Sequence, residues 1–252
     1  MIFENLPLIC LFIFAAVLGG FIRRLSGFGG ALIMTPLLMW MFPIPFLIPI
    51  VMCSEIFGGV LLSRQWKVHA EDRPQLWFML FFAAVFLPIG IWLARFIPLV
   101  ILKLSTSAVV MFFASYLLLK PHVRLNSSNA LDGLAGSLSG LLLGSCGIGG
   151  PPAALYLNSI NKAFDRTRSL LSQFISGISV FAIIAASSMG GGLDWFAYLL
   201  LAIPSYWLGM ILAKRVLEAH TVSDNALKRL CLLLLIANAG FNLLFLFIFE
   251  SI

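Results

Sequence analysis

Apolar residues form long unbroken runs along the chain, and short polar, Pro-containing or Gly-containing stretches separate them. The runs extend over about 15–20 residues without two-residue alternation, which is typical of membrane-spanning helices and not of β-barrel strands. Ten helical segments are expected, at 6–22, 28–42, 46–63, 75–94, 98–119, 130–145, 150–161, 168–189, 195–213 and 227–249. The second and seventh segments are too short to cross a hydrocarbon core of about 30 Å.

Composition agrees with this pattern. The chain has 252 residues, of which 61% are apolar and 10% are charged, whereas roughly a quarter of the residues in soluble domains are charged. These values exclude a soluble globular protein and a disordered chain. We therefore predict an all-α integral membrane protein with a single transmembrane domain and the lipid bilayer as its surroundings. Nucleic acid is not expected as a partner, because no basic and aromatic module is present.

The basic residues are distributed unequally between the connections. We assume that every segment crosses the membrane, or that each short segment returns the chain to the side from which it came. Fourteen of the sixteen Lys and Arg then fall in odd-numbered connections. The other side carries only Arg95 and Lys103. The positive-inside rule then places the odd connections in the cytoplasm and both termini outside, for a multi-pass protein of the cell (inner) membrane.

An internal repeat divides the chain into two halves. The sequence Ser-Gly-Phe-Gly-Gly at 26–30 matches Cys-Gly-Ile-Gly-Gly at 146–150, with an offset of 120 residues. The halves cover 1–120 and 130–252, and a polar cytoplasmic linker at 121–129 joins them. Because each half has five segments, the second half is inserted upside down relative to the first. Such inverted-topology repeats recur in secondary transporters and channels.

The two glycine motifs are the strongest candidates for a binding site. Clusters of small residues break a helix, and the free N–H groups of the next helix form an anion-binding end. Broken or re-entrant helices at the motifs would bring two such ends together near the membrane midplane. The predicted substrate-binding residues are Gly27, Phe28, Gly29, Gly30, Gly147, Ile148, Gly149, Gly150 and Pro151. The alternative is close helix packing of the GxxxG kind.

Four further residues are candidates on weaker grounds. Arg24 would hold an anion if the hairpin after the first segment dips into the membrane; otherwise it belongs to a cytoplasmic pair of arginines. Glu55 is an acid inside a predicted span, and it is a candidate for proton coupling or for a structural hydrogen bond near a helix end. Its repeat counterpart Gln173 keeps the shape without the charge. Asn242 shares a helix face with Asn238, which favours either interhelical hydrogen bonding or cavity lining.

No signal for an enzyme, a metal or a cofactor emerges from the sequence. The four cysteines form no CxxC pair and lie in apolar segments, as buried thiols do. The three histidines fall in predicted loops and are too scattered for a metal site. The motifs of intramembrane zinc proteases and of P-loop pumps are absent from the sequence.

The motifs Gly-Phe-Gly-Gly at 27–30 and Gly-Ile-Gly-Gly-Pro-Pro at 147–152 resemble those of the TauE/SafE family of sulfite exporters. The resemblance covers nearly the whole chain, including the repeat, the size and the basic loops. Two departures are Ala31, where many members have a third Gly, and the preceding pair Arg23–Arg24. The resemblance implies secondary transport of small sulfur-containing or organic anions such as sulfite, sulfonates and sulfoacetate, often as export.

Several aspects of this function stay open at the level of sequence. Alternating access would come from one half moving against the other, with a proton or substrate gradient as the driving force and no organic cofactor. A passive anion channel or uniporter on the same scaffold is the alternative. The sequence fixes neither the anion nor the direction of transport, and it is compatible with a homodimer.

Overall fold

The computed structural model describes residues 6–119, 126–160, 163–188, 193–219 and 224–249. Within these ranges the chain forms α-helices and two short 3₁₀ helices, and it contains no β-strand. The elements are α1 Leu6–Ser26, α2 Gly30–Leu38, α3 Ile44–Ser63, η2 Ala70–Asp72, α4 Arg73–Ala94, α5 Leu99–Leu119, α6 Asn129–Cys146, α7 Gly150–Ser159, α8 Phe164–Ser188, η3 Leu193–Trp195, α9 Phe196–Ala219 and α10 Asp224–Phe249.

The all-α membrane fold predicted from the apolar runs is confirmed. Each expected segment is a helix, and six of the described helices are long and apolar enough to span a membrane. The expected second and seventh segments are α2 and α7, with 9 and 10 residues. The main errors are at helix ends, because α1 continues to Ser26 and α9 to Ala219. The predicted termini and most of the linker at 121–129 lie outside the described residues.

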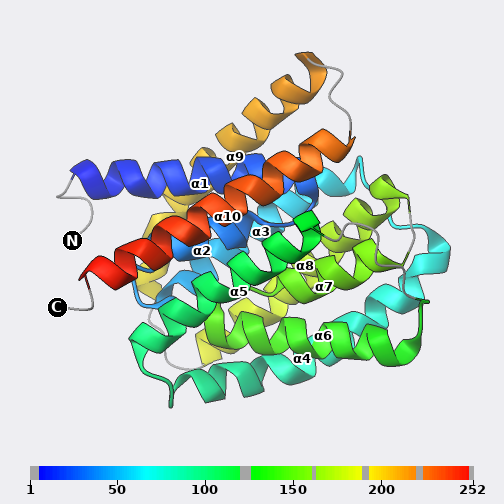
Figure 1. Ribbon diagram of the computed structural model, residues 1–252, viewed down its shortest axis with the longest axis horizontal. Coiled ribbons are helices and arrows are strands. Elements are labelled where there is room, and N and C mark those ends of the chain that lie inside the picture. Colours follow the sequence, from blue (N-terminus) through cyan, green and yellow to red (C-terminus); the bar gives the residue numbers. More distant parts are fainter. Residues whose placement is uncertain (1–5, 120–125, 161–162, 189–192, 220–223, 250–252) are drawn as a thin grey trace.

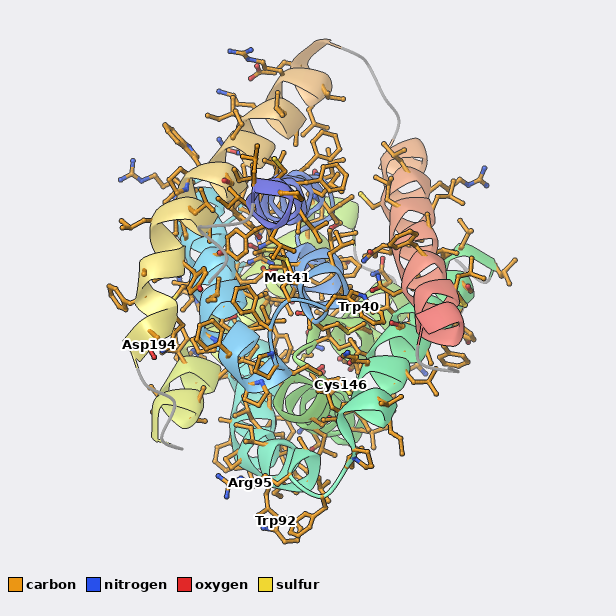
Figure 2. The ribbon with its side chains drawn as sticks, turned by 90° about the vertical axis from the view of Figure 1, so that its left-hand side faces the viewer. Trp40, Met41, Trp92, Arg95, Cys146 and Asp194 are labelled. Carbon is orange, nitrogen blue, oxygen red and sulfur yellow. The ribbon has the colours of Figure 1, made fainter. Side chains whose placement is uncertain are left out.

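The helices run roughly along the long axis of the molecule, so their connections gather at two ends (Figure 1). We call the end that carries 64–72 and the start of α6 the basic end. The connections at 39–43 and 95–98 lie at the opposite end. Figure 2 looks onto this opposite end, where Trp40, Arg95 and Asp194 come from three different connections. This arrangement agrees with the unequal distribution of Lys and Arg, while the cytoplasmic location of the basic end stays a prediction.

Helix contacts in the two halves follow the same scheme. Helix α1 packs on α9 as α6 packs on α4, and α3 packs on α9 as α8 packs on α4. Helix α3 also contacts α8, and α5 contacts α10, so equivalent helices of the two halves meet. A two-fold relation between two repeats would produce this scheme. Two points remain predictions: that the halves 1–120 and 130–252 are structural units, and that they have opposite orientations in the membrane.

Glycines set the closest of these contacts. A Cβ added at Gly20 in α1 would collide with the carbonyl oxygen of Tyr206 in α9, and one added at Gly140 in α6 would collide with that of Ala83 in α4. The helix backbones in the pairs α1–α9 and α4–α6 therefore touch directly, as small residues permit in membrane proteins.

Candidate anion site between the glycine motifs

The two glycine motifs, 120 residues apart in the sequence, meet at one small cavity. Its walls include Gly29, Gly149, Gly150 and Glu55, and its volume is about 10 Å³. This is room for about one water molecule. The structure therefore brings the two motifs together, as the sequence predicted, and it adds Glu55 to the same cavity wall.

Backbone conformation explains part of each motif. Helix α1 ends at Gly27, whose φ is +81°, and Gly29, with a φ of +101°, precedes α2. In the second motif Gly147 ends α6 with a φ of +72°. L-residues with side chains rarely adopt such φ values, so these three positions favour glycine. The chain can then reverse within three residues and start a new helix inside the protein.

A buried ion pair stands at the start of α2. The Nε atom of Arg23 in α1 lies 3.1 Å from Oε2 of Glu55 in α3, and neither side chain is exposed. The other carboxylate oxygen of Glu55 accepts a hydrogen bond from the backbone N–H of Ala31, at 2.6 Å. The carboxylate therefore occupies the positive N-terminal end of α2 itself. The anion that such a helix end attracts is, in this structure, one of the protein's own side chains.

Tyr206 in α9 completes this cluster. Its side chain is fully buried, and a Cβ at Gly30 would collide with both its hydroxyl and Oε1 of Glu55. The phenol and the carboxylate therefore both approach the Cα of Gly30 on the side where another residue would carry its Cβ. Gly30 is needed for this close approach and not for an unusual φ, since its φ is not in the left-handed region.

Arg23 also connects the cluster to the second half of the chain. Its Nη2 donates to the backbone carbonyl of Ser172 and to the hydroxyl of Ser176, both at 3.0 Å, and its Nη1 donates to the carbonyl of Gly27 at 2.6 Å. One guanidinium thus holds the end of α1, the carboxylate on α3 and the backbone of α8. Buried charges need such partners to offset the cost of their desolvation.

The other predicted residues lie at separate places. Arg24 points to the basic end, where its Nη2 donates to Oε1 of Gln65 at 3.1 Å. Gln173 lines a groove of about 470 Å³ at the same end, with Lys67 and Arg73. Neither of the two is among the residues that line the central cavity. The arginine beside the carboxylate is Arg23, one position before the residue that the sequence suggested.

The remaining candidates lie away from the central cavity. Phe28 and Pro151 line a second small cavity of about 10 Å³ against α5 and α10. Ile148 is fully buried. Oδ1 of Asn242 accepts a hydrogen bond from Nε1 of Trp40, in the α2–α3 connection, at 2.6 Å.

Sequence reasoning missed Arg23 and Tyr206 as members of the site. The sequence contained a signal for Arg23, because Arg23 follows the small residues Ala16 and Gly20 on one helical face of α1. In the structure all three residues are buried. Tyr206 shares a face of α9 with Gly209 and Met210, but a single tyrosine in an apolar helix carries little information. Its role depends on the contact between α1 and α9.

The architecture defines a polytopic all-α membrane protein, with two short helices that start inside it at the glycine motifs. A family model described as sulfite exporter TauE/SafE matches residues 12–241, nearly the whole chain. The chain belongs to this family, as the paired glycine motifs indicated. No curated protein and no solved structure matches the chain.

Proposed function

We propose that the protein is a secondary carrier of small anions, in the sulfite, sulfonate and organic anion class, and that Glu55 couples transport to protons. One observation carries this proposal: the Glu55 carboxylate sits on the N-terminus of α2 and against Arg23, in the wall of the cavity where both motifs meet. Arg23 and the N–H of Ala31 form an anion receptor, and Glu55 is the anion bound there in the absence of substrate.

Protonation of Glu55 frees this receptor. A neutral carboxyl group no longer balances the Arg23 charge, so the guanidinium and the α2 N-terminus attract an external anion. The substrate anion and the proton on Glu55 then travel together, and deprotonation on the far side returns the carboxylate to Arg23. The second motif offers fewer donors, because Pro151 and Pro152 of α7 have no backbone N–H.

The distribution of space supports a carrier over a passive channel. A cavity of about 390 Å³ lies at the opposite end and a groove of about 470 Å³ at the basic end, while the cavity between the motifs has about 10 Å³. An ion cannot pass from one side to the other without a change in this arrangement. Alternating access needs such a narrow point between two accessible spaces.

Uptake into proteoliposomes tests the proposal. Wild-type protein should take up labelled sulfite, or a member of a panel of small sulfonates and carboxylates, in a saturable manner and faster under an inward proton gradient. Glu55→Gln replaces the carboxylate with a carboxamide that is always neutral, so we expect uptake to lose its dependence on the proton gradient. Glu218→Gln serves as the matched control, because Glu218 is exposed and forms an ion pair with Lys214, one turn before it in α9.

Two outcomes would contradict the proposal. Uptake that responds to the gradient equally in wild type and Glu55→Gln would remove Glu55 from coupling. Flux that neither saturates nor responds to the gradient in wild type would favour the passive channel.

A further inference from the structure

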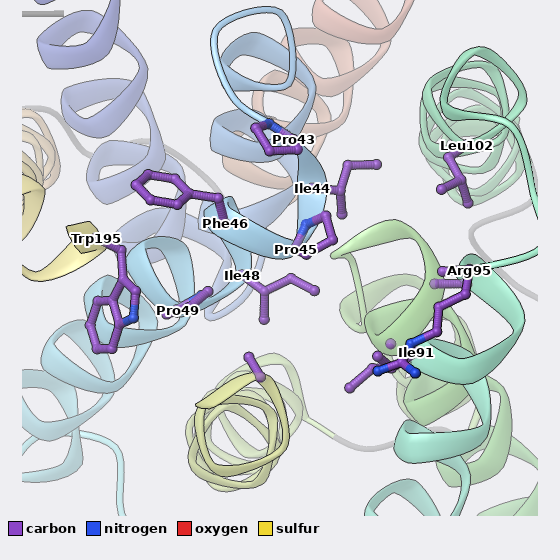
Figure 3. A pocket seen from close by; sticks show the side chains of 14 residues that line it. Pro43, Ile44, Pro45, Phe46, Ile48, Pro49, Ile91, Arg95, Leu102 and Trp195 are labelled. Carbon is purple, nitrogen blue, oxygen red and sulfur yellow. The ribbon is translucent and has the colours of Figure 1, made fainter. Parts of the chain in front are cut away.

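An apolar cavity lies at the opposite end of the molecule (Figure 3). Its volume of about 390 Å³ is within the range of small-molecule binding sites, about 300–1,000 Å³. The wall consists of Pro43 and the start of α3, the ends of α4, α6 and α8, the start of α5, and Trp195. The surface is mostly apolar, with Ile44, Phe46, Ile48 and Trp195 among its residues. Sulfite, with four heavy atoms and no apolar part, does not suit such a wall.

One charged residue lines this cavity, namely Arg95 at the end of α4. Its side chain is exposed, and no described carboxylate pairs with it. Arg95 is also one of the two Lys and Arg that the sequence places on this side. A guanidinium without a partner beside an apolar wall fits a ligand with an anionic head and an apolar body.

The cavity reaches the second glycine motif. Gly144 and Ser145, which precede this motif in α6, line it. Ile44 and Ile48 line it as well, and their side chains would lie 3.5 and 3.7 Å from a Cβ added at Gly147. Behind Gly147 the hydroxyl of Thr35 donates to the carbonyl of Gly147 at 3.3 Å. Consecutive residues of α6 therefore border the two spaces, since Leu143 lines the central cavity and Gly144 lines this one.

We infer that this cavity is an entry site for an organic anion with an apolar body, in which Arg95 binds the anionic head and the wall of α3, α4 and Trp195 binds the body. The inference rests on the proposed transport function and narrows its substrate class to organic sulfonates or carboxylates. Arg95 determines the charge of the ligand, and the volume of the cavity determines its size.

Equilibrium binding of labelled benzenesulfonate to the full-length protein in lipid nanodiscs tests this site. The affinity of benzenesulfonate should be at least tenfold higher than the affinities of methanesulfonate and sulfite, measured by competition against the labelled ligand. Arg95→Gln should weaken binding about tenfold or more, while Arg95→Lys retains part of it. Ala94→Trp, which places a large side chain in the cavity wall, should abolish binding. The matched control is Arg215→Gln, since Arg215 is an exposed arginine of α9 at the basic end.

A neutral analogue and a lipid analysis complete the experiment. Phenyl methyl sulfone has the apolar body without the charge, so it should compete weakly, and Arg95→Gln should not alter its competition. Equal affinities for sulfite and benzenesulfonate, or an unchanged affinity in Arg95→Gln, would overturn the inference. Retention of one phospholipid by wild type and its loss in Arg95→Gln, with no binding of benzenesulfonate, would show a lipid site instead.

Transport measured on the same preparations separates the two proposals. Saturable sulfite uptake without benzenesulfonate binding would overturn the entry site and leave the carrier intact. Benzenesulfonate binding that depends on Arg95, without uptake of any anion of the panel, would overturn the carrier and leave the binding site.

Discussion

Arg23 and Glu55 place two opposite charges in the interior of a membrane protein, with neither side chain exposed. Desolvation of such a pair costs several kcal/mol for each ion, and removal of one partner of a buried pair costs about 3–5 kcal/mol. A hydrophobic pair of similar volume is often at least as stable. Stability alone therefore gives little reason for these charges, and intramembrane charges mark functional sites as a rule. Their position on the α2 N-terminus links them to anion binding.

The motif glycines differ in what a side chain would meet, which makes one of them a clean test of the central site. A Cβ at Gly150 would lie 3.6 Å from both Ile175 and Phe28, an ordinary van der Waals distance, and Gly150 lines the central cavity. In Gly150→Ala we expect anion uptake to fall at least tenfold, because the methyl group occupies part of a space of about 10 Å³. The melting temperature should change by no more than about 2 °C.

Gly240→Ala is the matched control for this substitution. Gly240 lies in α10 and outside the wall of the central cavity. A Cβ added there would also meet a side-chain atom, of Met111, at 3.6 Å. Wild-type uptake in Gly150→Ala would show that the motif glycines serve packing, which is the alternative that the sequence left open.

The sequence predicted the place of the site better than its chemistry. A repeated cluster of small residues and an acid inside an apolar run are local patterns, so both motifs and Glu55 were found from the sequence alone. The selection between Arg23 and Arg24 depends on where α1 ends, and α1 continues four residues beyond the expected boundary. The added turn places Arg23 on the buried face beside Gly20 and leaves Arg24 at the basic end. Tyr206 joins the cluster only through tertiary packing.

At the scale of helices, glycine contacts hold the pairs α1–α9 and α4–α6 together. Helix α6 has glycines at 136, 140 and 144, and an added Cβ at each would collide with a carbonyl oxygen of α4. This four-residue spacing keeps one face of α6 free of side chains over two turns. The positions and types of the elements followed from apolar runs, whereas these pairings join distant parts of the chain and were not predicted.

Substitution within α6 tests the importance of this contact. In Gly140→Ala the added methyl group would collide with the carbonyl of Ala83, so we expect a loss of about 1–3 kcal/mol of stability. For a chain of this size the melting temperature in detergent should fall by about 2–4 °C per kcal/mol. Gly133→Ala in the same helix is the control, because its nearest neighbour is a Phe78 side-chain atom at 3.4 Å. Equal melting temperatures of the two variants would refute the direct backbone contact.

At the scale of the whole molecule, the two glycine-packed pairs favour a division into moving bodies that differs from the two sequence halves, with α3 and α8 packed against each other across it. Helices α1, α3 and α9 pack on one another, as do α4, α6 and α8, and each group contains helices from both halves. Movement of one half against the other would break both glycine-packed pairs. Arg23, Glu55 and Tyr206 all belong to the α1–α3–α9 group, and Arg23 reaches the other group through Ser172 and Ser176. We therefore expect the two groups to move relative to each other.

Two cysteine pairs at the basic end distinguish these divisions. Arg166 binds Asp72 and Glu71, so positions 72 and 166 link the two sequence halves within the α4–α6–α8 group. Arg168 donates to the carbonyl of Arg24 at 2.9 Å, so positions 24 and 168 link the two groups. With all native cysteines replaced, a short reducible thiol cross-linker should stop anion uptake in Arg24→Cys/Arg168→Cys, and reduction should restore it. Cross-linked Asp72→Cys/Arg166→Cys should keep transporting, since that link joins helices that move together. Loss of uptake in the second pair would instead assign the movement to the two sequence halves.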